Sequence, residues 1–282
     1  MKKKNLVLIM TLPLLLFHCG KKEGTPTGNT TAPIDIPEGW QLVWHDEFDG
    51  TAIDTSKWQH EVNARGGGNN ELQYYTDRAK NSYVKDGVLV IQALKEHYTG
   101  PEGTREYTSA RLRTKNRGDW KYGLFIVRAK LPSGKGLWPA IWMMPTDNVY
   151  GGWAASGEID IMEMLGHEPN KVYGTLHYGA EWPNNVHSGD SFTLPSGSFD
   201  QDFHVFSLQW DTTKISWYVD GQLYQTQTKW YTKAAPYPAP FDQRFYLILN
   251  VAVGGNWPGN PDSTTVFPQQ MLVDYVRVLQ KN

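Results

Sequence analysis

Short runs in which apolar and polar side chains alternate dominate the chain from Trp40 onward, and turn-forming residues separate them. Successive side chains of a strand point to opposite faces, so Ile215, Trp217 and Val219 would share one face. Asp-Gly pairs at 86–87 and 220–221 each separate two such runs, which is typical of β-hairpin turns. No stretch has a sustained helical period. The pattern predicts an all-β fold, an antiparallel sandwich of the jelly-roll type. The clearest expected strands are 83–94, 122–131, 172–178, 203–210, 215–219, 245–253 and 271–279.

Two polar segments, 63–70 and 181–200, are too long for hairpin turns. Long loops of this kind often carry binding residues, because a rigid scaffold holds them at the surface. We therefore expect them to form the rims of a binding cleft.

The N-terminus carries a targeting pattern. Lys2, Lys3 and Lys4 precede the apolar run 6–17, as in a secretory signal peptide, and this run is short for a membrane-spanning helix. Cys19, the only cysteine, excludes an internal disulfide. It closes a string that resembles the lipobox of bacterial lipoproteins, although His18 stands where a small residue is usual.

This pattern divides the chain into a lipoprotein signal peptide at 1–18, a flexible tether at 19–37 and one folded domain at 38–282. The expected location is outside the inner membrane of a bacterium, with a lipid on Cys19 as the only membrane attachment. A soluble secreted protein with an incidental cysteine is the alternative.

Charge and aromatic content bear on the partner. The formal net charge is only −2, so no global field attracts nucleic acid. Aromatic residues make up 13% of the chain and include 12 tryptophans. Buried core packing and stacking on sugar rings both explain such a content, and the count alone does not separate them.

Three acids lie close together in Glu158-Ile-Asp160-Ile-Met-Glu163. On a regular strand, Glu158 and Asp160 would share one face, and Glu163 would lie on the other face with the isoleucines. Burying the isoleucines would then bury Glu163 without a partner, which is costly. A β-bulge near residues 161–162 removes this conflict, because one extra residue turns Glu163 to the Glu158 face.

Three carboxyl groups so close together cannot all ionise cheaply, so the group is expected to keep a proton. A protonated carboxyl beside an ionised one is the pair that glycoside hydrolysis requires. The residues alone leave open which of Glu158 and Glu163 is the acid. An edge strand whose acids face solvent is the alternative without a function.

Other chemistries lack their motifs. None of the 8 histidines has the spacing of a zinc site, residues 66–68 lack the lysine of a phosphate loop, and no Gly-x-Ser-x-Gly elbow is present. His177 follows the acid strand and could bind a sugar hydroxyl or be an ordinary core histidine.

The acid segment resembles the active-site signature of glycoside hydrolase family 16. Its Glu-x-Asp-x-x-Glu form is similar to the laminarinase-like (endo-1,3-β-glucanase) branch, whereas lichenases typically have one residue fewer. Four further blocks at 44–50, 69–76, 136–144 and 245–258 occur in the family's order. The resemblance therefore covers about residues 40–279 and marks 38–282 as the catalytic domain.

The resemblance implies a jelly roll of two bent sheets with an open concave cleft and retaining endo-hydrolysis of β-1,3-glucan, typically laminarin. It implies Glu158 as the nucleophile, Asp160 as the assisting acid and Glu163 as the acid/base. The substrate-binding positions that it implies are Asn70, Arg111, Trp138, Trp142, His177 and Trp257.

The resemblance also implies a structural calcium ion at Glu47, Gly87 and Asp274, the first two through backbone carbonyls. No cofactor is expected for catalysis, and a single tethered domain favours a monomer. Three alternatives stay open: the same fold acting on mixed-linkage glucan or an algal galactan, a transglycosylase, and a non-catalytic glucan-binding lipoprotein.

Overall fold

The computed structural model describes residue 34 and residues 36–282. The expected signal peptide, Cys19 and nearly all of the expected tether lie outside the described residues. Within the described part, no helix is long and apolar enough to cross a membrane.

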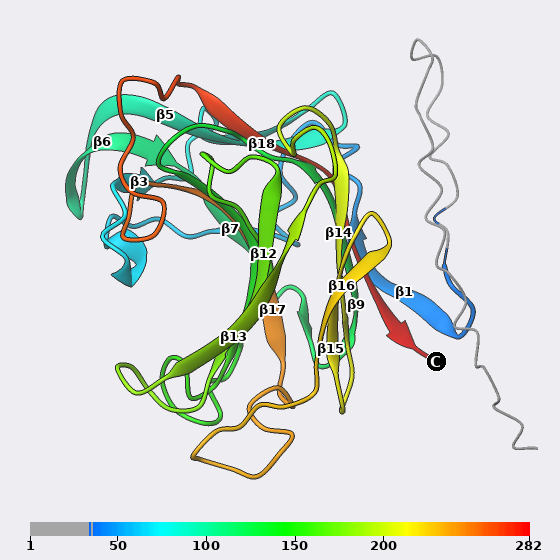
Figure 1. Cartoon of the computed structure of the whole chain (residues 1–282). Coiled ribbons are helices and arrows are strands. Elements are labelled where there is room, and N and C mark those ends of the chain that lie inside the picture. Colours follow the sequence, from blue (N-terminus) through cyan, green and yellow to red (C-terminus); the bar gives the residue numbers. More distant parts are fainter. Residues whose placement is uncertain (1–33, 35) are drawn as a thin grey trace, which may run out of the picture. The chain divides into compact units, whose positions relative to one another are not determined.

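Two β-sheets pack into a sandwich, and Figure 1 shows the layer with β12, β13 and β17 beside the layer with β9, β14 and β15. The 8-stranded sheet runs in the order β13 (Val186–Thr193), β12 (Lys171–Tyr178), β11 (Glu158–Glu163), β10 (Leu137–Pro145), β17 (Phe245–Val253), β7 (Arg111–Arg113) and β2 (Gln59–His60), with β8 (Asp119–Trp120) also on β17.

The 10-stranded sheet forms the other layer. Its order is β16 (Gln222–Gln227), β15 (Ile215–Val219), β14 (His204–Trp210), β9 (Gly123–Lys130), β18 (Gln269–Lys281), β5 (Val88–Gly100), β6 (Gly103–Ser109) and β3 (Gln73–Tyr75), with β1 (Trp40–Asp46) on β18 and β4 (Ser82–Lys85) on β5. The described part also has one short 3-10 helix, Gly66–Gly68. The predicted all-β jelly-roll sandwich is confirmed.

Both predicted hairpin turns are present. Val219 pairs with Gln222 and Lys85 pairs with Val88, which leaves two-residue turns. All four turn residues have positive φ angles between 49° and 78°, the conformation for which Asp-Gly is favoured.

Two details differ from the sequence prediction. The segment 181–200 is not only a loop, because it contains β13. Strand β13 lies at the end of its sheet and its sequence is mostly polar, so it lacks the alternation on which the prediction depended. The second difference is that β3 and β6 pair in parallel, within sheets that are otherwise antiparallel.

The core lies between the two sheets and is rich in large side chains. Trp210, Trp217, Phe206 and Phe245 are almost fully buried in it. Aromatic side chains bury large areas, so much of the aromatic content stabilises the sandwich. The sheet that carries β11 is thereby held rigidly against its partner.

Candidate active site

The acid strand β11 lies inside its sheet, between β10 and β12. Glu158 pairs with His177 of β12, and Asp160 pairs with Thr175 of β12 and with Trp142 of β10. An edge strand with acids facing solvent is therefore excluded. Asp160 is only 2% exposed.

The predicted bulge is present at residues 161–162. On the β10 side, Trp142 pairs with Asp160 and the next residue back, Ile141, pairs with Met162. The ladder with β12 is shifted at the same place, between Asp160 and Glu163. Ile161 and Met162 both enter the core, and Glu163 returns to the face of the other acids.

The opposite sheet supports this bulge. Trp217 of β15 donates a hydrogen bond from its indole N–H to the backbone carbonyl of Asp160, at 2.8 Å. Gly174, opposite the bulge on β12, makes room for the indole, because a Cβ there would lie 2.5 Å from the Trp217 ring. The buried carbonyl of Asp160, next to the bulge in the ladder, thus has a hydrogen-bond donor.

Burial and mutual repulsion set the protonation of the acids. Burial raises the pKa of Glu158 to about 8, and the negative charge of Asp160 adds to this shift. Burial also raises the pKa of Asp160 to about 7, and it raises the pKa of Glu163 well above its usual range. The three acids therefore hold at least one proton at neutral pH, as the sequence predicted.

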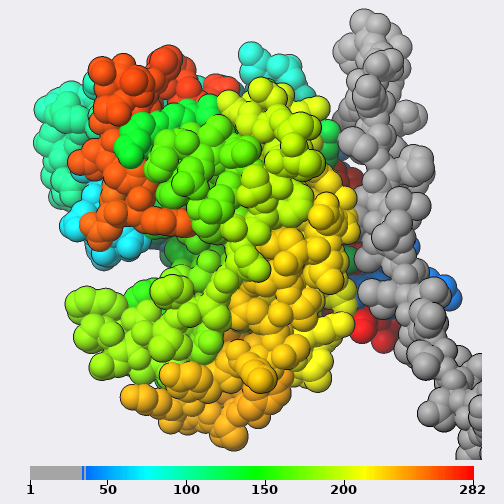
Figure 2. All heavy atoms as spheres, in the orientation of Figure 1, coloured from blue at the N-terminus to red at the C-terminus, as the bar shows by residue number. Residues whose placement is uncertain are grey.

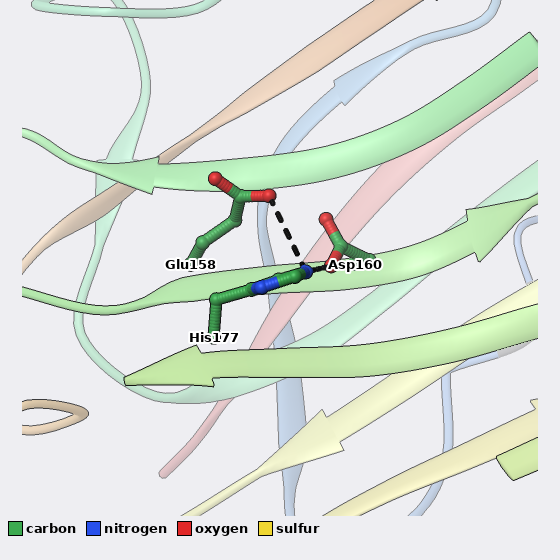
Figure 3. A group of neighbouring side chains, drawn as sticks. All are labelled: Glu158, Asp160 and His177. Carbon is green, nitrogen blue, oxygen red and sulfur yellow. Dashed lines mark ion pairs between the residues drawn. The ribbon is translucent and has the colours of Figure 1, made fainter. Parts of the chain in front are cut away.

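Hydrogen-bond donors reach the acids from the surrounding elements. Trp138 donates its indole N–H to Oε1 of Glu163 at 3.0 Å, and Trp153 donates to Oε2 of Glu158 at 2.6 Å. His177 Nε2 lies 3.4 Å from Oδ2 of Asp160 and 4.0 Å from Oε1 of Glu158 (Figure 3). The two glutamates are thus held by different indoles, with His177 beside Asp160.

A cleft of about 490 Å³ opens over these acids. Figure 2 shows the surface hollowed between an upper rim of cyan and orange atoms and a lower rim of green atoms. Besides the three acids, the lining has four tryptophans, two asparagines, small or aliphatic residues and one further charged pair of residues, Glu71 and Arg111: Gly67, Gly68, Asn69, Glu71, Arg111, Trp138, Ala140, Trp142, Met144, Trp153, Trp182, Asn250 and Ala252. Apolar walls with a few convergent polar groups are typical of a ligand site.

Three predicted substrate-binding residues, Arg111, Trp138 and Trp142, line this cleft. Arg111 lies over the Trp142 ring, 5.3 Å from its centroid. Trp257 packs edge-on against Trp138 with 5.5 Å between ring centroids, and it is 41% exposed. Asn70 lies beside the cleft-lining residue Asn69 and donates a hydrogen bond to Asn256 at 2.9 Å.

Several lining residues were not singled out from the sequence. Asn250 accepts a hydrogen bond from the Trp142 indole at 2.7 Å and donates to the hydroxyl of Tyr75 at 3.1 Å, which fixes the Trp142 ring. Trp153 and Trp182 come from loops, and the backbone N–H of Trp182 binds the carbonyl of Trp153 at 2.8 Å. An indole after two glycines, at 151–153, was the available signal for a loop tip.

The hydrogen bond from Trp153 predicts a tuning role for this indole. It stabilises the ionised form of Glu158, so Trp153→Phe, which keeps a ring but loses the N–H, is expected to raise the pKa of Glu158. If Glu158 must be ionised to react, the acid limb of the kcat/KM profile moves to higher pH. We expect kcat/KM to fall about tenfold at acidic pH, for one lost charge-assisted hydrogen bond. Measuring kcat/KM against pH checks this.

Trp182→Phe is the matched control. Trp182 lines the same cleft but is 71% exposed, and none of the acids accepts its indole N–H among the described residues. Its pH profile should keep the wild-type midpoint. If Trp153→Phe also keeps it, the indole does not tune Glu158.

Two groups of residues bear on metal binding. Glu158, Asp160 and His177 offer one ligand atom each within 4.8 Å of one another, although no sequence spacing announced this set. These atoms belong to the acid cluster, where His177 lies at ion-pair distance from both carboxylates.

The predicted calcium positions converge in the other sheet. Strands β1 and β5 both pair with β18, the strand that carries Asp274. Asp46, which precedes Glu47, pairs with Val276, and Leu89, which lies two residues after Gly87, pairs with Val273. However, Asp274 binds Arg128 at 2.6 Å, and both oxygens of Glu47 bind Arg277, at 2.8 and 2.7 Å. Two arginines thus neutralise the two carboxylates, so these side chains fit a cation poorly. A calcium ion here would depend mainly on backbone carbonyl ligands. The calcium ion stays a prediction.

Comparison with known proteins agrees with this geometry. The model of the family described as "Glycosyl hydrolases family 16" matches residues 68–277. The chain is 46% identical over 276 residues to glucan endo-1,3-beta-glucosidase A1 of Niallia circulans, an alignment that covers 92% of this chain but 39% of that protein. It is 46% identical over 248 residues to beta-glucanase of Rhodothermus marinus, with 85% of each chain covered.

Among solved structures, the catalytic domain of an endo-1,3-beta-glucanase (laminarinase) from Thermotoga petrophila RKU-1 is similar, with a TM-score of 0.78 and 46% identity. The match covers 86% of this chain and 98% of that domain. The family model spans the acid strand, the bulge and the cleft-forming strands from β3 to β17. This chain belongs to glycosyl hydrolase family 16.

Proposed function

We propose that this protein is an endo-1,3-β-glucanase that hydrolyses laminarin-type polysaccharide with retention of the anomeric configuration. The observation that carries the proposal is the bulged acid strand, which presents Glu158, Asp160 and Glu163 together in an aromatic-lined cleft. The relatives named for the same activity on β-1,3-glucan support the choice of substrate.

In the first step, Glu163 acts as the general acid. Its raised pKa keeps a proton on the carboxyl, and the indole N–H of Trp138 donates a hydrogen bond to Oε1 of the same group. The proton passes to the glycosidic oxygen as the bond from the anomeric carbon to that oxygen breaks. An ionised Glu158 attacks the anomeric carbon and forms a glycosyl ester.

In the second step, the two glutamates exchange tasks. Glu163, now ionised, takes a proton from water while the water oxygen attacks the anomeric carbon. The ester bond to Glu158 breaks, and its electron pair returns to the carboxylate, which accepts the Trp153 N–H at 2.6 Å. Besides burial, the charge of Asp160 raises the pKa of Glu158 and of Glu163. His177, whose Nε2 lies 3.4 Å from Oδ2 of Asp160, lowers both pKa values in part.

Product sizing on four polysaccharides tests the proposed function. Laminarin is expected to fall rapidly in chain length to mixed oligosaccharides, because an open cleft admits the middle of a polymer, and lichenan is expected to be cut more slowly. Agarose and carrageenan serve as controls and should stay intact. Cleavage of a galactan but not of laminarin would contradict the substrate assignment, and longer products would indicate transglycosylation.

We also propose that Cys19 carries a lipid that anchors the enzyme outside the inner membrane, and that the anchored enzyme is a monomer. The support is the sequence alone, namely three lysines, the apolar run 6–17 and the cysteine that follows. Replacing Cys19 with serine should move the protein from the membrane fraction to the soluble fraction. Unchanged fractionation would contradict the anchor.

A further inference from the structure

A second hollow, which we call the edge groove, lies at one open edge of the sandwich. It lies between β13, the end strand of the 8-stranded sheet, and β16, the end strand of the other sheet. Its volume is about 390 Å³, and it is lined by Tyr178, Ser188, Gly189, Asp190 and residues 225–229.

Polar side chains point into the space between the sheets at this edge. Ser188 pairs with Leu176, and Gln225 pairs with Trp217, and both partners are fully buried core residues. Directly paired residues of an antiparallel ladder point to the same face, so Ser188 and Gln225 also point inward. The interior of a sandwich is normally apolar at such positions, and here it is polar.

Gln225 is the most unusual of these residues. It is 8% exposed, and neither its amide nitrogen nor its amide oxygen has a hydrogen-bond partner in the described part of the chain. Gln227, two residues on, is satisfied, because it accepts from the Ser188 hydroxyl at 2.5 Å and donates to the Ser188 carbonyl at 2.9 Å. Both amide atoms are shielded from solvent, so the Gln225 amide presents two donors and an acceptor to an occupant of the groove once its side chain turns outward.

The remaining groups indicate what such an occupant is. Asp190 and Lys229 contribute one negative and one positive charge, so the groove favours neither anions nor cations. Tyr231, 48% exposed, packs edge-on against the groove residue Tyr178 with 5.7 Å between ring centroids. Amide, carboxylate and ammonium groups beside an exposed aromatic ring suit a neutral ligand with many hydroxyls and an apolar ring face.

The groove also lies where a polymer would leave the catalytic cleft. The cleft residues come from β7, β17, β10 and β11, and the paired His177 of β12 and His187 of β13 continue the same face to the end of the sheet. Their rings lie 5.6 Å apart. A chain that crosses these strands reaches the outer edge of β13, where the edge groove begins.

We propose that the edge groove is a second, non-catalytic binding site for a distal segment of the same β-glucan chain. This inference rests on the proposed function, and it predicts that long or insoluble glucan gains affinity that a short oligosaccharide cannot. The amide of Gln225 and the carboxylate of Asp190 supply the hydrogen bonds, and Tyr231 supplies a ring beside them.

Binding to insoluble β-1,3-glucan particles tests the proposal. Gln225→Leu combined with Asp190→Ala should weaken binding to the particles about three- to tenfold, the cost of one or two hydrogen bonds. Hydrolysis of a laminari-oligosaccharide too short to leave the cleft should stay within about twofold of wild type. Gln222→Leu, on the same strand but outside the groove, is the matched control and should bind normally.

The readouts separate the possible failures. Gln225→Leu removes a buried amide that has no hydrogen-bond partner, so the fold should survive this substitution. Tyr231→Ala, at an exposed ring, is a second groove variant and should also weaken binding to the particles. If wild type cleaves glucan and both groove variants bind particles as wild type does, the second site does not exist. If wild type neither binds nor cleaves β-1,3-glucan, the proposed function fails first.

Discussion

Replacing Glu158 with serine is expected to reduce hydrolysis of β-1,3-glucan at least about a thousandfold, because the glycosyl ester can no longer form. Binding should survive, since the aromatic walls of the cleft, such as Trp138 and Trp142, are untouched. Activity on laminarin and binding of a laminari-oligosaccharide by calorimetry measure the two effects. Substantial activity in this variant would contradict the nucleophile assignment.

The same variant should be at least as stable as wild type at neutral and alkaline pH. The pKa of Glu158 is raised from its ordinary value of 4.5 to about 8, so the folded state binds a proton that the unfolded state releases between these values. The contribution of Glu158 to stability is therefore present below pH 4.5 and is lost as pH rises through about 8. Serine does not titrate in this range, so Glu158→Ser does not lose stability in this way as the pH rises. Glu168→Ser, which removes a carboxylate that accepts the Tyr173 hydroxyl at 2.7 Å outside the cluster, is the control and should not gain stability at high pH.

Replacing Glu163 with alanine is expected to lower activity on laminarin about a hundred- to ten-thousandfold, the usual range for a lost general acid and base. A substrate with a good leaving group bypasses the first proton transfer, so the glycosyl ester on Glu158 should then accumulate. Azide needs no base, and it should enter the space left by the missing carboxyl and release the sugar as a β-glycosyl azide. Product analysis by NMR identifies the anomer.

Azide also resolves the symmetry between the two glutamates. In Glu158→Ser, azide would attack the substrate directly from the side of the missing nucleophile and give the α-glycosyl azide. If instead the Glu163 variant gives the α product and the Glu158 variant gives the β product, the two roles are exchanged. Wild type with azide serves as the control and should give only sugar products.

The shape of the acid strand could be predicted from the sequence because a regular strand would have buried Glu163 in the core together with the isoleucines. A strand has a period of two, so Glu158 and Glu163 could share a face only if one residue in between was extra. The bulge at 161–162 confirms this argument. What local sequence could not predict was its support, since Trp217 belongs to the other sheet and lies 57 positions further along the chain.

Other features were missed because their signals are not periodic. Strand β13 is polar and lies at the end of its sheet, so backbone pairing with β12 determines it rather than an apolar face. Trp153 lies in a loop, where a single indole reveals nothing about its partner, and only the fold brings it to Glu158. The edge groove likewise depends on two strands that meet only in the folded protein.

In the proposed mechanism, the bulge places Glu158 and Glu163 as a nucleophile and an acid/base for double displacement on β-1,3-glucan. Proton NMR during the first minutes of laminarin hydrolysis tests it most directly, because it reads the configuration of new reducing ends before they equilibrate. With double displacement, we expect the β-anomer to form first and then to mutarotate. Initial formation of the α-anomer would mean direct attack by water and would contradict it.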